Sequence, residues 1–156
     1  GASVGMDGRG TAIARKENYC EIDPNKVDKF GIPVLKFNYK WSNEEVLQAK
    51  HMMETFQEIM HNMGAVITSN IPGADTLYGL ATPGKIIHEG GTTRMGDDPK
   101  TSVLNKWGQA HDCNNLYVVD AGPFVQQGDK NLTWTILALS MRTSEYILEQ
   151  KNKLNS

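Results

Sequence analysis

The stretch His-Glu-Gly-Gly-Thr-Thr-Arg-Met-Gly at residues 88–96 is the most distinctive part of the sequence. Its glycines let the backbone adopt left-handed conformations and approach a ligand closely. A histidine beside such a turn can face a cavity with little steric shielding, and imidazole exchanges a proton near neutral pH. The pattern makes His88 a candidate for acid–base chemistry, and on spacing alone a purely structural loop histidine is the alternative.

A second informative stretch, Asn-Leu-Tyr-Val-Val-Asp-Ala-Gly at residues 115–122, predicts a short buried strand over residues 116–119 that ends in a polar turn. Active sites in open α/β sheets lie at the carboxyl ends of strands, which is where Asp120 falls. Further on, Asn131 precedes a predicted helix, whose free N–H groups and dipole favour negative charge. Taken alone, Asp120 is expected to cap a turn and Asn131 to cap the helix.

The composition is that of a globular protein and argues against several functional classes. The chain has 156 residues, 39% of them apolar and 22% charged, and its net charge is −2. This is enough material for one domain with a core, and the charge predicts no binding to nucleic acid. Cys20 and Cys113 are too few and too far apart for a disulfide framework or a zinc site. No apolar run of membrane length and no signal peptide are present, and the compartment stays open.

The first half of the chain predicts an extended region followed by a helix. Residues 1–16 are expected to be a flexible lead-in. Residues 19–39 have an extended pattern with a turn at Pro24–Asn25, and alternation from Leu35 onwards predicts a half-buried strand. Ser42 and Glu45 have the spacing of a capping box, which predicts the start of a helix.

The rest of that helix and the remaining elements follow from periodicity and from turn residues. Gly64 should end the helix. Its apolar positions recur at helical spacing: Val46, Ala49, Met53, Phe56, Ile59, Met60 and Met63. A short strand over 65–68, a loop over 69–85 and a turn-rich linker over 103–110 are expected next. A last helix should open at Thr133 or Thr135 and run to about Gln150.

Other reactive side chains give weaker signals. His51 and His61 lie ten residues apart on the predicted helix, so they do not share a face and do not form a metal pair. The adjacent residues His111, Asp112 and Cys113 cannot easily converge as ligands, and no metal site is predicted. A hydrolase that uses His88 and Asp120 would lack a credible nucleophile, because the Gly-x-Ser-x-Gly at residues 1–5 lies in the glycine-rich lead-in and not in a strand-to-helix elbow.

The two stretches together resemble the C-terminal signature of the glucose–methanol–choline (GMC) family of FAD-dependent oxidoreductases. In that family a histidine followed by Gly-Thr and then Met-Gly marks the active site. The matching residues here are His88, Gly91, Thr92, Met95 and Gly96. The sugar-oxidising branch, typified by pyranose oxidases, also has the second glycine and the arginine, which are matched by Gly90 and Arg94. The resemblance implies that His88 and Asn131 are the catalytic side chains facing a substrate alcohol.

The resemblance also implies a fold and a cofactor. The fold class is α+β: residues 17–114 would form part of an antiparallel, helix-covered substrate domain. Residues 115–150 would be the last strand and helix of the FAD-binding domain, with 151–156 as a tail. FAD would lie near four residues: Asp120, Ala121, Leu132 and Thr133. The family usually has proline where Leu132 stands, and Leu can adopt the same φ without that rigidity.

The function implied is oxidation of a CH–OH group, with a secondary hydroxyl of a sugar or glycoside as the expected donor. Hydride would pass to FAD and His88 would act as the base. No Gly-x-Gly-x-x-Gly occurs in these residues, so the chain alone should be inactive and should depend on a missing N-terminal FAD-binding part. A homo-oligomer is possible. The alternative is a non-catalytic interaction module that has kept the fold.

Overall fold

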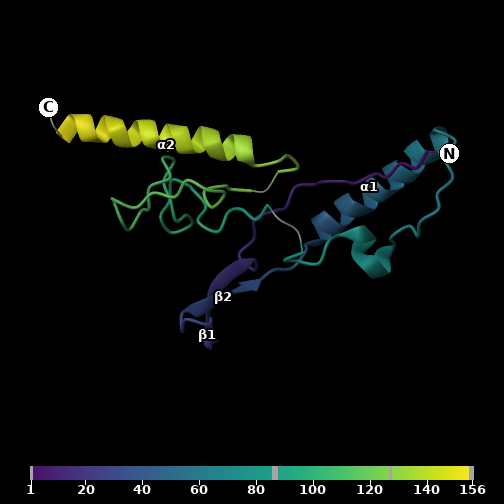
Figure 1. Cartoon of the computed structure of the whole chain (residues 1–156), viewed down its shortest axis with the longest axis horizontal. Coiled ribbons are helices and arrows are strands. Elements are labelled where there is room, and N and C mark those ends of the chain that lie inside the picture. The colour runs from purple at the N-terminus through teal and green to yellow at the C-terminus, as the bar shows by residue number, and fades with distance from the viewer. Residues whose placement is uncertain (1, 86–87, 127, 155–156) are drawn as a thin grey trace.

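The computed structural model describes residues 2–85, 88–126 and 128–154, and it contains two strands, one 3₁₀ helix and two long α-helices. In chain order they are β1 (Tyr19–Val27), β2 (Pro33–Asn38), α1 (Asn43–Asn62), η1 (Ala74–Gly79) and α2 (Thr133–Leu154). Figure 1 shows α1 and η1 at one end of the molecule and α2 above a set of long loops at the other. The antiparallel strands and separate helices confirm the predicted α+β class.

The β1–β2 hairpin turns later than the sequence suggested. The Oδ1 atom of Asp28 accepts hydrogen bonds from the backbone N of Phe30 at 2.8 Å and of Ile32 at 3.0 Å. Gly31 completes the turn with a φ of +82°, which favours glycine. The predicted turn at Pro24–Asn25 is therefore wrong, because these residues lie inside β1 where its pairing with β2 is irregular.

One face of the hairpin is apolar and open. Ile22 pairs with Leu35 and Cys20 pairs with Phe37, so these side chains share one face of the two strands. Ile22, Leu35 and Phe37 expose 64%, 58% and 63% of their surface. The prediction of a half-buried strand under covering helices is wrong within this chain, because neither helix packs on the hairpin among the described residues.

Helix α1 begins and ends where the sequence predicted. The Ser42 hydroxyl accepts from the backbone N of Glu45 at 3.3 Å, and the Glu45 carboxylate accepts from the backbone N of Ser42 at 2.6 Å. Two donors that a helix start would otherwise leave free are thus satisfied reciprocally. At the other end Met63 is the C-cap and Gly64 follows with a φ of +68°. Both predicted boundaries are confirmed.

The N-terminal segment around residues 11–13 and the helix η1 both pack against α1. The backbone N of Thr11 donates to the Gln48 side chain and that of Ile13 donates to Glu45, both at 2.9 Å. Part of the segment expected to be flexible therefore lies along the helix, as Figure 1 also shows. On the other side η1 packs against α1. The strand predicted over 65–68 is wrong: this stretch is coil that leads toward η1.

The most buried part of the chain is a set of loops over residues 91–124, which we call the loop body. Its centre is Leu104, which has 0% of its surface exposed. Isolated bridges join Met95 to Leu104, Leu104 to Ala110 and Gln109 to Tyr117. The strand predicted over 116–119 is wrong, because Tyr117 makes only this single bridge and so no extended ladder forms.

Helix α2 opens at Thr133, as predicted, and one side of it is fixed to the loop body. The Thr143 hydroxyl donates to the carbonyl O of Trp107 at 2.9 Å. The Tyr146 ring stacks on Trp107 with centroids 4.7 Å apart and planes 4° from parallel. The opposite side carries a stripe of exposed apolar residues: Trp134, Leu137, Met141 and Leu148.

The total exposed surface is large for the size of the chain. It amounts to 11992 Å² for 17.3 kDa. A compact monomer of this mass would expose about 7,800 Å² by the usual scaling of surface with mass. Much apolar surface, on the hairpin and on α2, is therefore left uncovered by the described residues. Among the described helices, none has the length and apolar character that crossing a membrane would need.

Candidate functional site

The two stretches that the sequence singles out lie side by side. Three backbone N–H groups of the first donate to three successive carbonyls of the second. The bonds are Gly91 N to Ala121 O at 3.1 Å, Thr93 N to Gly122 O at 3.2 Å, and Met95 N to Pro123 O at 3.0 Å. The strand predicted within the second stretch does not form, but the two stretches converge.

Glycine is required where the two stretches touch. Gly91 has a φ of +84°, and a Cβ there would lie 3.0 Å from the carbonyl O of Phe124. On the facing side, a Cβ on Gly122 would lie 2.2 Å from Oγ1 of Thr93 and 2.8 Å from Oδ1 of Asp120. Contacts this short are not compatible with a side chain unless neighbouring atoms move. The junction therefore depends on the close backbone approach that glycine allows.

His88 itself has an unusual backbone conformation. Its φ is +86°, in a region that non-glycine residues rarely adopt. The sequence predicted such conformations for the glycines that follow, but not for the histidine. The side chain is half-buried, and it stands three residues before Gly91, where the junction begins. Strain of this kind is concentrated at ligand and active sites, where the surrounding structure maintains it.

Asn131 lies just outside the start of α2. The carbonyl O of Leu132 accepts from the backbone N of Ile136 at 2.9 Å, so Leu132 is the residue that flanks the helix. The N-cap alternative for Asn131 is therefore wrong: the residue is exposed and stands one position before the cap. Leu132 is buried, with 7% of its surface exposed, and anchors this corner, while Thr133 is the first residue of the helix.

Asp120 and Ala121 belong to the turn at the junction. The Oδ1 atom of Asp120 accepts from the backbone N of Gly122 at 2.7 Å, which is the turn-capping arrangement that the sequence left open. The carbonyl O of Ala121 accepts from both Gly91 and Phe124. The first turn of α2 contains no acidic residue, so the free N–H groups at this helix end face no carboxylate of their own turn.

The arginine of the first motif has a structural role. The Nε atom of Arg94 donates to the carbonyl O of Thr101 at 2.9 Å, and the Arg94 carbonyl O accepts from Val103. The side chain thereby closes the loop that follows the motif. This geometry accounts for the residue without any contact to a substrate.

His111 is also structural. Its Nε2 atom lies 3.0 Å from the Ser102 hydroxyl and 3.2 Å from the carbonyl O of Gly96. The Ser102 hydroxyl donates to the Asp98 carbonyl at 2.7 Å, so its proton is already committed. His111 must then act as a donor, which we infer from this bonding pattern. It does not activate Ser102 as a nucleophile. In the described part of the chain, no three side chains of the metal-binding types lie together.

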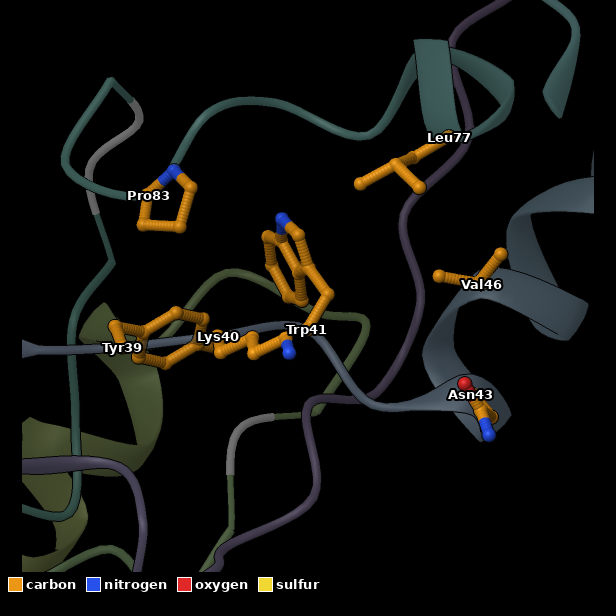
Figure 2. Close-up of a pocket in the computed structure, with 7 residues that line it drawn as sticks. All are labelled: Tyr39, Lys40, Trp41, Asn43, Val46, Leu77 and Pro83. Atoms are coloured by element: carbon orange, nitrogen blue, oxygen red, sulfur yellow. The ribbon is translucent and has the colours of Figure 1, made fainter. Parts of the chain in front are cut away.

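Two hollows of the surface lie elsewhere, on the two sides of Trp41. One, of about 340 Å³, lies between the start of α1 and Pro83, and the other, of about 290 Å³, borders η1. Figure 2 shows the indole between Tyr39 on one side and Leu77 on the other. None of the predicted site residues lines either hollow.

Tyr39, which lines the first hollow, and Asp129, in the loop before Asn131, have shifted pKa values. Burial raises the pKa of the Tyr39 phenol, and the Glu45 carboxylate adds to the increase. In the loop before Asn131, the ammonium of Lys130 bonds to Asp129 and lowers the pKa of that carboxyl. The charges of this pair offset each other, so the segment presents little net charge.

Comparison with known proteins identifies the family. The sequence matches the GMC oxidoreductase family over residues 15–140. It is 34% identical over 138 residues to a 2-methyl-1,2-propanediol dehydrogenase from Mycolicibacterium austroafricanum, covering 88% of this chain and 24% of the relative. It is 30% identical over 148 residues to a gluconate 2-dehydrogenase flavoprotein from Pantoea cypripedii, covering 94% of this chain and 24% of the relative. It is 41% identical over 131 residues to a fructose dehydrogenase large subunit from Gluconobacter japonicus, covering 84% and 22%.

The chain therefore belongs to the GMC oxidoreductase family, and the predicted family is confirmed. It spans about a quarter of the length of these relatives. The sequence missed the pairing of Thr93 with Gly122, because nothing in the order of residues indicates which glycine faces which side chain.

Proposed function

From this family membership we propose that the chain is the C-terminal part of an FAD-dependent oxidoreductase that oxidises a CH–OH group. The observation that carries the proposal is the hydrogen-bonded junction of Gly91, Thr93 and Met95 with residues 121–123. It ties the histidine motif to the segment that leads into α2. In the sequence His88 precedes one side of this junction and Asn131 follows the other, so the junction would join the two segments that carry a catalytic pair.

The residues around the junction suit an anionic cofactor group. The N-terminal end of a 22-residue helix has free N–H donors and a positive dipole end, and α2 has no acidic side chain in its first turn. Ala121, Leu132 and Thr133 would hold FAD here, with Asp120 fixing the turn beside it. When bound, FAD supplies the acceptor for a hydride. The chain contains no phosphate-binding glycine motif, so the remaining contacts would come from the missing N-terminal part.

The chain's own residues would perform two tasks. His88 would remove the proton of the substrate hydroxyl as the C–H hydride leaves, and its strained backbone would hold the imidazole in place. The Asn131 amide would orient the alcohol, because an amide can donate to one oxygen and accept from a neighbouring hydroxyl. Both groups are needed on the same side of the reacting carbon, and the junction would help to fix the backbone that carries each side chain.

A secondary hydroxyl of a sugar or glycoside is the proposed donor. The named substrates of the relatives, fructose, gluconate and 2-methyl-1,2-propanediol, all have adjacent hydroxyls, which suits the two-sided amide of Asn131. Arg94 gives this assignment no direct support, because its Nε is bonded to Thr101. A substrate panel on the complete enzyme tests the assignment, and a preference for monohydric short alcohols would overturn it.

The large exposed surface supports a missing N-terminal partner region. The chain exposes 11992 Å², about half as much again as a compact protein of its mass, and the apolar faces of the hairpin and α2 are open. These faces would pack against the remainder of the protein, and the chain alone would be inactive. The alternative is a non-catalytic module that has kept the fold. Absence of flavin absorbance near ~450 nm from the full-length gene product would favour the module.

The role of His88 is tested in the complete enzyme by rapid-mixing measurement of flavin reduction. His88→Ala should slow reduction by roughly 10²–10⁴-fold, the usual loss for a general base, while FAD stays bound. His61→Ala, at an exposed position on α1, is the matched control and should leave the rate unchanged. Unchanged reduction in His88→Ala would remove the proposed base.

A further inference from the structure

Thr93 is a buried hydroxyl without a hydrogen-bond role inside the described chain. Its backbone N donates to the carbonyl O of Gly122 at 3.2 Å. Its Oγ1 atom is buried and has no hydrogen-bond partner among the described residues. A buried unpaired hydroxyl is unfavourable, and such a group in a native structure calls for an explanation. Hydrogen bonding within the chain does not explain why threonine stands here.

The position of the hydroxyl indicates a role in packing against Gly122. A Cβ on Gly122 would lie only 2.2 Å from Thr93 Oγ1, so this oxygen occupies the space that the glycine leaves free. An oxygen is smaller than the methyl group that valine would place there. The contact is therefore fitted from both sides: an oxygen at residue 93 and no side chain at residue 122. Threonine is also stiff about χ1, which keeps the contact defined.

The contact lies between the two arms that carry the proposed catalytic pair. On one arm, Gly91 stands three residues after His88, and its backbone N donates to the carbonyl O of Ala121 on the other arm. On the other side the chain runs from Gly122 toward Asn131 and α2, and Arg142 of α2 reaches back to the Met95 sulfur at 3.9 Å. A shift at residue 93 or 122 would move one arm relative to the other.

We infer that Thr93 is a positioning residue, which through its contact with Gly122 sets the spacing between His88 and Asn131. The inference rests on the proposed function and deepens it. The Oγ1 atom of Thr93 has no hydrogen-bond partner among the described residues, so Thr93 would act through the backbone of the junction. A displacement of an ångström or less between catalytic groups can cost up to about a hundredfold in rate. Small changes in bulk at this contact should therefore reduce the rate without unfolding the protein.

The test uses the full-length flavoenzyme and measures the limiting rate of flavin reduction, the substrate concentration for half-saturation, the FAD content and the thermal midpoint. Thr93→Val replaces the oxygen with a methyl group and should lower the limiting rate roughly 3–10-fold. Thr93→Ser keeps the oxygen and should retain the wild-type rate. In both variants the half-saturation, FAD content and thermal midpoint should stay close to wild type, which a general loss of structure would not allow.

Glycine substitutions provide the second test of the contact. Gly122→Ala adds a Cβ against Thr93 and should lower the rate about 10–100-fold, whereas Gly5→Ala is the matched control because nothing lies within 4 Å of its added Cβ. Adding Thr93→Ala to Gly122→Ala removes the oxygen and should recover part of the rate. This recovery separates Thr93 from Asp120, whose Oδ1 would lie 2.8 Å from the same Cβ.

The outcomes distinguish the two proposals. If His88→Ala does not slow reduction, the proposed function fails whatever Thr93 does. If His88→Ala slows reduction but Thr93→Val behaves like wild type, the positioning role is overturned while the base is retained. Equal loss in Thr93→Ser and Thr93→Val would also overturn it, because the oxygen would then not matter. Should Gly122→Ala fail to fold, the valine–serine pair still decides.

Discussion

The α1 region and the loop body are organised in opposite ways. Helix α1 is regular and is stabilised by bonds between near neighbours, including the Ser42–Glu45 capping box. The loop body, residues 91–124, has only isolated bridges, yet it contains Leu104, the most buried large side chain of the described chain. Several of its hydrogen bonds join residues far apart in the sequence, such as Gly91 and Ala121.

The difference shows that regular secondary structure and tight packing need not coincide. A helix satisfies its backbone internally, so it can form with only a few buried residues, such as Ala49, beneath it. A loop must find its hydrogen-bond partners elsewhere, and when those partners are other loops the result is a close-packed junction. In this chain the proposed chemistry lies at such a junction and not on a long regular element.

The largest expected effect would test whether the loop body is the true centre of the fold. Leu104→Ala removes a side chain with 0% exposure and should cost about 2–5 kcal/mol of local stability. Leu47→Ala, on α1 at 62% exposure, is the control and should change stability by less than about 0.5 kcal/mol. Amide hydrogen exchange over residues 91–124 in the full-length protein measures the effect of each substitution on local stability. Equal protection in the two variants would contradict the comparison.

The capping box of α1 provides the next test. Ser42→Ala should cost about 1 kcal/mol, the usual loss for an N-cap. Glu45→Ala should cost more, because this buried carboxylate also accepts from the backbone of Ile13 and lies 4.0 Å from Arg15. Glu58→Ala, at an exposed position of the same helix, is the control for the loss of a charge. Thermal denaturation ranks the three, and a smaller loss for Glu45→Ala than for Ser42→Ala would contradict the proposed anchor.

The exposed stripe of α2 should affect association more than stability. Trp134 and Met141 expose 83% and 66% of their surface. Replacing both with Gln should reduce self-association and hydrophobic-dye binding of the chain expressed without its N-terminal part, with stability changed by less than about 0.5 kcal/mol. Glu145→Gln on the same helix should alter neither property. A parent chain that is monomeric and does not bind the dye would contradict this expectation.

The smallest effect concerns alkaline titration near α1. Burial, with Glu45 adding to it, raises the pKa of Tyr39, so the folded state favours the neutral phenol. This contribution to stability is present below the unfolded pKa of about 10 and is lost as pH rises through the higher folded value. Tyrosinate absorbance should therefore show a late-ionising component that disappears in Tyr39→Phe and persists in Tyr19→Phe. A component unchanged in Tyr39→Phe would contradict the shift.

The predictions from sequence succeeded where local chemistry decides the outcome. The start of α1 at Ser42, its end at Gly64 and the opening of α2 at Thr133 were all predicted correctly. They failed where a partner is needed. The turn was placed at Pro24–Asn25, because a Pro-Asn pair is a strong turn signal, but Asp28 and Gly31 form the hairpin turn. The strand over 116–119 lacks the neighbour that a ladder requires.

The site divides along the same line. The sequence by itself determined the family, because the histidine motif and the segment that leads to Asn131 are defined by residue type and spacing. It also determined α1, because capping and periodicity act within a few residues. Only the tertiary structure decided that Gly91 and Thr93 bond to residues 121 and 122, that Arg94 and His111 hold loops, and that Thr93 faces Gly122. These contacts join distant residues through backbone groups, which every residue carries, so residue type alone does not specify their pairing.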